Sequence, residues 1–338
     1  MKVDGGFGRS PDLRGVIETA QHHEAAGYDG LWSAETSNDP FMPLLLAAEH
    51  TERIELGTGI AVAFARNPMT LAQIGYDLQY YSGGRFILGL GSQIKPHITK
   101  RFSMEWSRPA ARMREMSLAI RAIWAAWAGE EKLRFKGDFY THTLMTPFFD
   151  PGPNPHGNAR IFLAGVGDKM TEVAGEVADG FLCHGFTTES YLREVTLPAL
   201  ERGLATTGRS RDDFEISGPF FVVTGTNEEE MEQSVAATKQ QMAFYGSTPA
   251  YRPVLEHHGW GDLQGELNSM SKQGKWAEMA GLIDDDMLGA FAVVGEPEDI
   301  AAGIASRYGG VVDRISFYAP YQSDPERWKA VMEELKAA

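Results

Sequence analysis

Cysteine is almost absent from this 338-residue sequence, which contains Cys183 and no second cysteine. A single cysteine excludes an internal disulfide and every metal site built from several thiolates. The adjacent pairs His22-His23 and His257-His258 have side chains that diverge, so we predict no metal site. The chain also lacks a run of ~18 apolar residues and an apolar leader at its amino terminus. We therefore expect a soluble, cytoplasmic protein with no membrane partner.

Basic residues are outnumbered, with 31 Lys and Arg against 46 Asp and Glu, giving a formal net charge of −15. This charge repels polyanions, so we expect no nucleic-acid partner. Residues 95–114 depart from that background. They carry a run of basic side chains opposed only by Glu105, namely Lys95, Lys100, Arg101, Arg108, Arg112 and Arg114. The segment is either a solvated helix face with its lead-in loop or an anion clamp.

Glycine, by contrast, is abundant and is placed in a repeated pattern. Three apolar runs each end in a Gly-x-Gly turn: Ile54–Gly59, Phe86–Gly91 and Ile161–Gly167. Each run is strand-like and leads toward a helical pattern. Such turns lie at the carboxyl edge of a parallel sheet, where α/β proteins bind ligands. We therefore expect the three turns to meet at one binding site.

Strand-like and helical segments alternate along the chain in about eight βα units. The first helix is predicted to start at Ser10 and Pro11, and apolar residues at helical spacing predict a helix over 110–128. Residues 129–159 and 245–290 interrupt the alternation and are interpreted as insertions. No Gly-x-Gly turn has the third glycine of the dinucleotide-binding fingerprint, which disfavours a doubly wound sheet. We predict an α/β protein, a single (β/α)₈ TIM barrel domain over residues 1–338 with these two insertions.

Several longer motifs, in this order and spacing, resemble the luciferase-like monooxygenase superfamily of (β/α)₈ flavin and deazaflavin oxidoreductases. They are AGYDGLWSAE, ELGTGIAV followed by ARNPMTLA, YSGGRFILGLGS, IFLAGVGDKM, ADGFLCHG and VVGEPEDIA. The similarity covers nearly the whole chain and is greatest to the branch that uses coenzyme F420. It implies a (β/α)₈ barrel that binds this cofactor. Similarity to the family is also the one basis for expecting a homodimer.

The resemblance assigns cofactor contacts to the three turns. Residues Thr58, Gly59 and Ile60 match the family's β-bulge behind the central cofactor ring, where the Gly59–Ile60 peptide is expected to be cis. The loop Gly165, Val166 and Gly167 matches the one whose amides bind the cofactor phosphate, and Gly91, Ser92 and Gln93 match the turn beside the ribityl chain. Lys95 and Arg101 are expected to attract the phosphate and the oligoglutamate tail.

Three residues at strand ends are candidates for catalysis. Glu35 is the first candidate for the polar group near the reactive ring edge and Asp39 the second, although Glu35 is equally well explained as a structural carboxylate bound to backbone or to an arginine. His184 could exchange a proton with substrate near pH 7, or it could be a packed histidine. Cys183 is expected to be inert core.

These observations lead to one function and two alternatives. We predict an F420-dependent oxidoreductase that transfers a hydride between the deazaflavin and a small organic substrate. The first alternative is an FMN-dependent monooxygenase of the same fold. The second is a flavin-binding or deazaflavin-binding barrel without catalytic activity.

Overall fold

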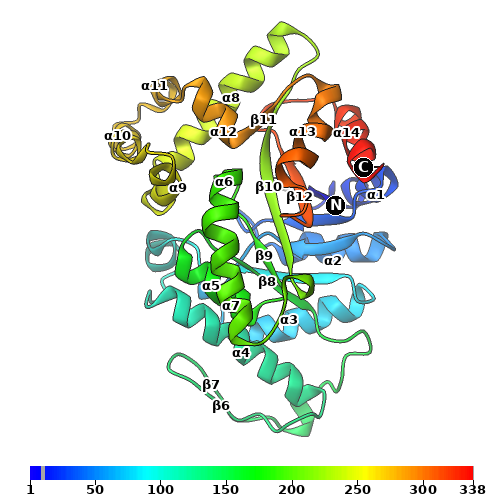
Figure 1. Cartoon of the computed structure of the whole chain (residues 1–338). Coiled ribbons are helices and arrows are strands. Elements are labelled where there is room, and N and C mark those ends of the chain that lie inside the picture. Colours follow the sequence, from blue (N-terminus) through cyan, green and yellow to red (C-terminus); the bar gives the residue numbers. More distant parts are fainter. Residues whose placement is uncertain (9–11, 338) are drawn as a thin grey trace.

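Eight parallel strands form a closed barrel in the computed structural model, which describes residues 1–8 and 12–337 (Figure 1). The strands are β1 (Lys2–Gly6), β2 (Gly30–Ser33), β3 (Glu55–Thr58), β5 (Phe86–Gly91), β8 (Arg160–Ala164), β9 (Gly180–Leu182), β10 (Glu215–Val223) and β12 (Arg314–Tyr318). Each strand pairs with the next in this order, and β12 pairs with β1 to close the ring. The predicted (β/α)₈ barrel is therefore confirmed, with all eight predicted strands in place.

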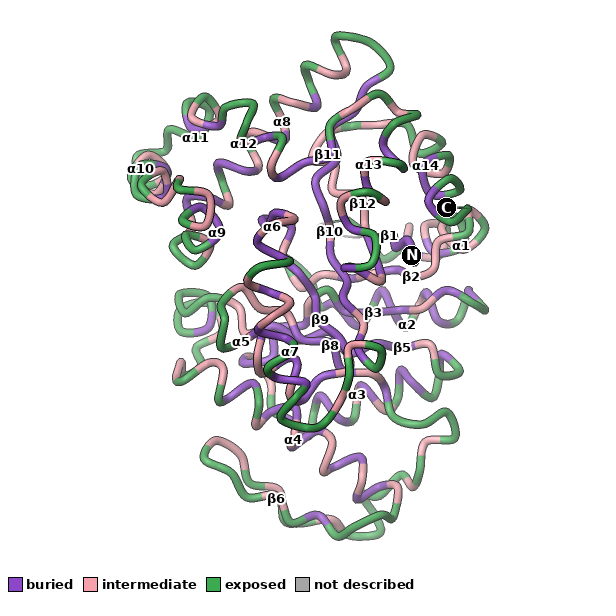
Figure 2. Tube along the Cα trace, in the orientation of Figure 1, coloured by how far each residue is buried: buried purple, intermediate pink, exposed green. Residues whose placement is uncertain are grey.

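The strands form where short apolar runs can be buried on both faces, as parallel strands require. All six residues of β5 are buried, and Figure 2 shows the strands as the most buried part of the chain. Two short strands extend the sheet: β4 (Ala61–Val62) pairs with β5, and β11 (Ala292–Val294) pairs with β10. The second of these was not predicted from the sequence.

Helices surround the barrel and connect its strands (Figure 1). They are α1 (Val16–Ala26), α2 (Phe41–His50), α3 (Pro68–Tyr81), α4 (Pro109–Trp127), α5 (Asp168–Val177), α6 (Glu189–Tyr191), α7 (Leu197–Thr206), α8 (Glu228–Gly246), α13 (Pro297–Tyr308) and α14 (Pro325–Ala337). The predicted helix over 110–128 is confirmed as α4. The predicted start at Ser10 and Pro11 lies outside the described residues. Within the described chain, every helix is too short or too polar to cross a bilayer.

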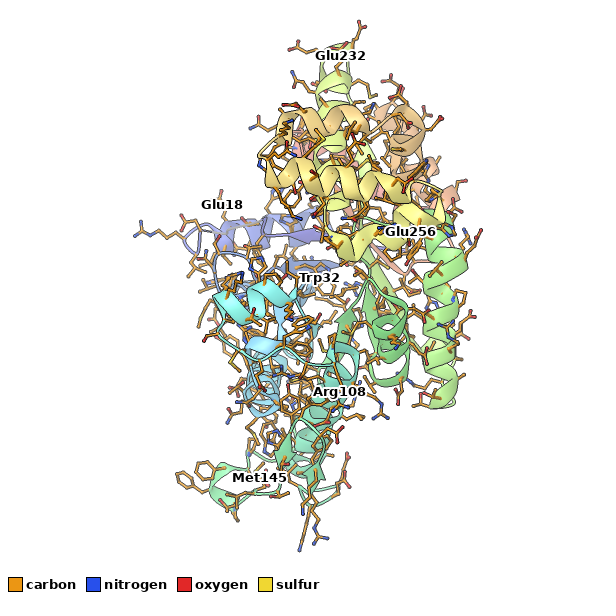
Figure 3. The ribbon with its side chains drawn as sticks, turned by 90° about the vertical axis from the view of Figure 1, so that its left-hand side faces the viewer. Glu18, Trp32, Arg108, Met145, Glu232 and Glu256 are labelled. Carbon is orange, nitrogen blue, oxygen red and sulfur yellow. The ribbon has the colours of Figure 1, made fainter. Side chains whose placement is uncertain are left out.

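The two predicted insertions have different structures. Residues 129–159 form an extended arm with a small hairpin of β6 (Phe135–Lys136) and β7 (Thr141–His142), and Met145 lies at the far end of the molecule in Figure 3. Residues 245–290 contain four short helices: α9 (Arg252–His257), α10 (Gly261–Lys272), α11 (Trp276–Met279) and α12 (Asp285–Phe291). The sequence showed no helical period here because α9 and α11 are about one turn long and α10 buries only Gln264 and Leu267.

The amino-terminal end of the barrel is closed by an ion-pair cluster. Arg314 is fully buried and donates two 2.8 Å bonds to the Asp4 carboxylate, and it also pairs with Glu55 and Glu215. Burial alone would raise the pKa of Glu55, but the Arg314 and Arg160 charges outweigh it and lower the pKa to about 2. Glu55 therefore stays ionised at neutral pH beside the buried guanidinium.

Candidate functional site

The three glycine turns line one cavity at the carboxyl end of the barrel. Its volume is about 2390 Å³, which exceeds the 300–1,000 Å³ of a typical small-molecule site. The turns contribute Gly59 and Ile60 after β3, Gly91, Ser92 and Gln93 after β5, and Gly165, Val166 and Gly167 after β8. The expected convergence of the turns is thus confirmed, and the cavity has room for a large cofactor together with a substrate.

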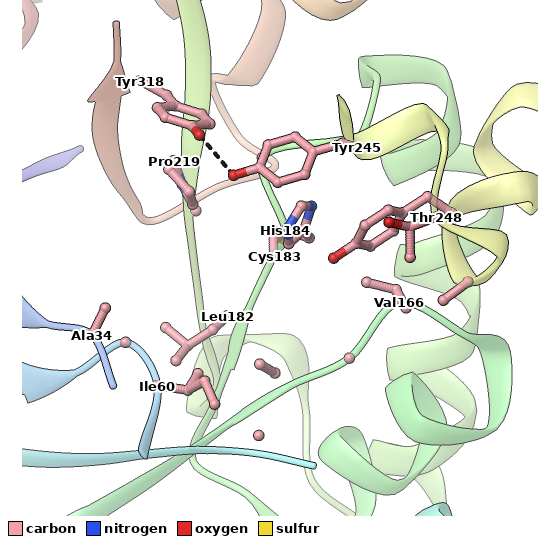
Figure 4. Close-up of a pocket in the computed structure, with 18 of the residues that line it drawn as sticks. Ala34, Ile60, Val166, Leu182, Cys183, His184, Pro219, Tyr245, Thr248 and Tyr318 are labelled. Atoms are coloured by element: carbon pink, nitrogen blue, oxygen red, sulfur yellow. Dashed lines mark hydrogen bonds between the residues drawn. The ribbon is translucent and has the colours of Figure 1, made fainter. Parts of the chain in front are cut away.

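The floor of this cavity is apolar and closely packed. The Gly59–Ile60 peptide is cis, as the resemblance predicted. A Cβ atom on Gly91 would lie 2.7 Å from Cδ1 of Ile60, so glycine is needed for the Ile60 side chain to occupy its place. Ile60 packs with Leu182 in a small apolar cluster, and Figure 4 shows these two side chains next to each other. The floor can support a planar ring.

Helix α5 points its amino terminus toward the cavity. Val166, Gly167 and Asp168 all line the cavity, and the first amides of a helix have no acceptor within it. A Cβ atom on Gly167 would meet nothing within 4 Å, whereas one on Gly165 would lie 2.8 Å from Cγ of Met170. Gly165 is therefore explained by packing. Gly167 leaves open space above the helix end, where an anion can approach the amides.

Three basic side chains line the cavity: Lys95, Arg108 and Lys169. Arg101, which we predicted to contact the cofactor, is not among the lining residues. Its guanidinium donates to the Thr36 carbonyl and lies over the Phe102 ring, 4.8 Å from the ring centre. The basic segment thus contributes to the site through Lys95 and Arg108, and Arg101 supports the adjacent loop.

Glu35 and Asp39, the first two candidates for catalysis, are not among the residues that line the cavity. The Glu35 carboxylate accepts from the Val62 amide at 2.7 Å and pairs with Arg66 at 2.5 Å. Asp39 binds the same guanidinium at 3.0 Å. The structure favours the alternative in which Glu35 is a structural carboxylate, because both oxygen-rich side chains are held by one arginine.

Thr58 is also structural in this fold. Its side chain is fully buried, and its hydroxyl donates to the Gly89 carbonyl at 2.6 Å and accepts from the Gly89 amide at 2.9 Å. Thr58 does not line the cavity. It fixes β3 against β5 and so positions the Gly59–Ile60 turn rather than contacting a ligand directly.

His184 lines the cavity at the end of β9, as expected, but it is not poised near pH 7. Burial lowers the pKa of His184 to about 4, so the imidazole is neutral at physiological pH. Its Nδ1 accepts from the Phe186 amide at 3.0 Å, which leaves the proton on Nε2. His184 is therefore a neutral hydrogen-bond donor. The neighbouring Cys183 thiol is buried, and burial raises its pKa to about 12, consistent with an inert thiol.

Three tyrosines complete the wall around His184, and two of them were missed by sequence reasoning. The His184 ring stacks on Tyr251 at 4.4 Å and meets Tyr245 edge-on at 4.6 Å between ring centres. The Tyr245 and Tyr318 hydroxyls share a 2.6 Å hydrogen bond, drawn in Figure 4. Tyr318 could be placed from its position at the end of a strand. Tyr245 and Tyr251 begin the segment without a period, so no pattern located them.

Within residues 1–8 and 12–337, no three His, Cys, Asp or Glu side chains lie close enough together to hold a metal ion. The site instead offers amides, a flat apolar floor, cations and neutral hydrogen-bond donors. These groups suit a planar anionic organic cofactor.

Comparison with known proteins agrees with this geometry. The model of the luciferase-like monooxygenase family matches residues 1–314. An uncharacterized protein of Mycobacterium tuberculosis is 58% identical over 93% of this chain and 92% of its own length. A 5,10-methylenetetrahydromethanopterin reductase of Archaeoglobus fulgidus is 26% identical over 90% of this chain and 89% of its own. The solved structure of the coenzyme F420-dependent tetrahydromethanopterin reductase of Methanopyrus kandleri has a similar fold, with a TM-score of 0.79, 21% identity and coverage of 99% and 96% of the two chains.

Proposed function

Because this chain belongs to the luciferase-like monooxygenase family, whose members are oxidoreductases, we propose that it is an F420-dependent oxidoreductase acting on a small organic substrate. One observation carries the choice of cofactor. The three glycine turns share their cavity with Lys95, Arg108 and Lys169, although the chain as a whole is strongly acidic. Arg108 also pairs with Asp138 at 3.0 Å, so Lys95 and Lys169 supply most of this positive charge. Two lysines beside a phosphate cradle suit a cofactor with a phosphate and further carboxylates better than FMN, which has a single phosphate.

The residues present fit this cofactor. The α5 amino terminus and the open space at Gly167 would hold the phosphate, and the Ile60 and Leu182 side chains would support the ring system. Gly91, Ser92 and Gln93 would border the ribityl chain that joins the ring system to the phosphate, and Lys95 lies two positions after Gln93. Bound F420 would supply the hydride chemistry.

The chain's own contribution is orientation, exclusion of water and a hydrogen bond from the neutral His184 side chain. The apolar floor and the aromatic wall limit water around the reacting atoms, which strengthens the hydrogen bonds made there. His184 holds a proton on Nε2 and keeps it at neutral pH because its Nδ1 is already an acceptor. Glu35 and Asp39 take no part, because Arg66 holds both of them outside the cavity.

An FMN-dependent monooxygenase is the second candidate, and the family's own description favours it. The same cradle and floor could accept FMN. The two candidates differ in how strongly binding of the cofactor should depend on the lysine and arginine side chains outside the phosphate site.

The test is a parallel titration of F420 and FMN, followed by quenching of tryptophan fluorescence. Trp32, Trp106 and Trp276 line the cavity, so a bound chromophore will quench them. We expect F420 to bind with micromolar or tighter affinity and FMN to bind more weakly.

Two lysines of one segment provide a matched pair for this titration. Lys95 lines the cavity and Lys100 is exposed outside it. Lys95→Ala should weaken F420 binding about tenfold and reduce its salt dependence, while Lys100→Ala should leave both nearly unchanged. Equal affinity for F420 and FMN, or equal effects of the two substitutions, would remove the reason for choosing F420. Tight binding without turnover of any acceptor would instead support the non-catalytic barrel.

A further inference from the structure

The wall of the cavity formed by β9, β10, α8, the turn Pro249–Tyr251 and β12 carries no charged side chain among its described lining residues. The charged residues that line the cavity are Asp4, Lys95, Arg108, Asp168 and Lys169, which lie on β1 or follow β5 and β8. Asp4 is paired with Arg314, Asp168 with Arg202 at 2.5 Å, and Arg108 with Asp138 at 3.0 Å, so Lys95 and Lys169 define the cationic side. The cavity is thus divided into a cationic side and a neutral aromatic side.

Two hydrogen-bond donors lie on the neutral side. The His184 imidazole carries its proton on Nε2, and this nitrogen has no hydrogen-bond partner among the described residues. Tyr318 can accept from Tyr245 in their shared 2.6 Å bond and keep its own O–H for a ligand. Both donors belong to one contiguous group, because the Tyr245 ring contacts His184 and its hydroxyl contacts Tyr318.

The group is held rigidly by its surroundings. The Tyr318 ring stacks on Phe221 at 4.7 Å and lies against Gly185, where a Cβ atom would come within 2.9 Å of the ring. The His184 ring is fixed between the Phe186 amide and the Tyr251 ring. Such packing places the two donors before any ligand arrives, which is the arrangement of a preorganised polar contact in an apolar pocket.

We propose that the substrate is a neutral, largely apolar molecule, and that His184 and Tyr318 bind its carbonyl or hydroxyl oxygen. Donors require an acceptor, and an oxygen with lone pairs is the acceptor that both can share. A carboxylate or an ammonium group bound here would be desolvated with no opposite charge beside it on the wall residues that the structure describes, so ionic substrates are disfavoured. This inference rests on the proposed function only in assigning the cationic side of the cavity to the cofactor.

The experiment measures binding of three para-related ketones to the full-length protein by ligand-observed NMR. The probes are acetophenone, the anion 4-acetylbenzoate and the cation 4-acetyl-N,N,N-trimethylanilinium, each titrated with and without F420. We expect acetophenone to bind at least about tenfold more tightly than either ion. An equal or tighter affinity for an ion, or no acetophenone binding at millimolar concentration, overturns the proposal.

Substitutions identify the donors. Tyr318→Phe removes the hydroxyl and keeps the ring stack on Phe221. His184→Asn keeps an acceptor near the position of Nδ1 but removes the donor at Nε2, whereas His184→Gln can place an N–H near that position. Tyr318→Phe and His184→Asn should each weaken acetophenone binding about five- to tenfold, and His184→Gln should restore part of the loss. The control Tyr80→Phe alters an exposed tyrosine and should change nothing.

Thermal unfolding shows that each variant is folded before its affinity is interpreted. Unchanged acetophenone affinity in folded Tyr318→Phe and His184→Asn proteins contradicts the proposal. The F420 titration separates the two hypotheses. Loss of F420 binding with ketone selectivity intact refutes only the proposed cofactor, and F420 binding without ketone selectivity refutes only the substrate assignment.

Discussion

The two ends of the barrel differ in how they place charged and polar groups. At the amino-terminal end, Arg314 is fully buried, and acidic side chains from β1, β3 and β10 neutralise it. At the carboxyl end, glycine turns leave space and backbone amides, and the buried His184 that faces this space is neutral. The first end places its charges where they compensate each other, and the second keeps polar groups available for a ligand.

This difference indicates where stability and binding reside. A buried ion pair is costly to break because the remaining charge has no partner. A glycine that faces open space contributes little to the free energy of unfolding. Its replacement should lower the affinity for a ligand instead. Suitable substitutions should therefore affect one end of the barrel and spare the other.

The largest expected effect is at the amino-terminal end. Arg314→Ala leaves the Asp4 carboxylate buried without its bidentate partner and should lower the free energy of unfolding by about 3–5 kcal/mol. Denaturant unfolding measures this loss. F420 affinity of the molecules that remain folded should stay close to that of the wild type.

Lys2→Ala is the matched control in the same cluster. Lys2 pairs with Glu55 at 3.0 Å but is substantially exposed, so its loss should cost no more than about 1 kcal/mol. A comparable cost for the two substitutions would contradict the view that burial of Arg314, rather than the number of ion pairs, stabilises this end.

A smaller effect is expected from neighbouring glycines at the carboxyl end. Gly167→Ala adds a methyl group to open space and should change stability by less than about 0.5 kcal/mol while weakening F420 binding about tenfold. Gly165→Ala places a Cβ atom against Met170 and should cost about 1–3 kcal/mol of stability. Calorimetric unfolding and F420 titration of both variants check the contrast. If Gly167→Ala binds F420 normally, the α5 amino terminus is not the phosphate site.

The remaining effect concerns the pH dependence of stability and is absent at neutral pH. The native His184 has a pKa of about 4, whereas the ordinary value of 6.5 applies to the unfolded chain. As the pH falls below 6.5, the unfolded chain binds the proton first, so stability is lost between pH 6.5 and 4 and is complete above this range. His184→Gln should reduce this loss by up to about 3 kcal/mol. Parallel denaturation curves at several pH values measure it, and identical slopes for both proteins would show that His184 is solvated.

The sequence predicted the barrel because strand and helix signals are local. Apolar runs such as the one that forms β5 are buried on both faces, and the glycine that follows them marks the turn at the carboxyl end. Since such ends must meet in a parallel barrel, the convergence of Gly59, Gly91 and Gly167 could also be predicted.

The surroundings of the candidate catalytic residues depend on side-chain partners that are distant in sequence. Glu35 follows β2 as a catalytic carboxylate would, but Arg66, 31 positions later, holds it outside the cavity. His184 has the position expected for a proton donor, and only its packing against Tyr251 and Tyr245 shows that it stays neutral. Neither partner is visible in a local pattern.

The most direct test of the central claim is a crystal structure of the protein with F420. The account predicts that the cofactor phosphate lies within hydrogen-bond distance of the amides of residues 166–169, with the deazaflavin ring against the Gly59–Ile60 peptide and Lys95 beside the tail. A cofactor bound elsewhere, or a phosphate held away from α5, would contradict it.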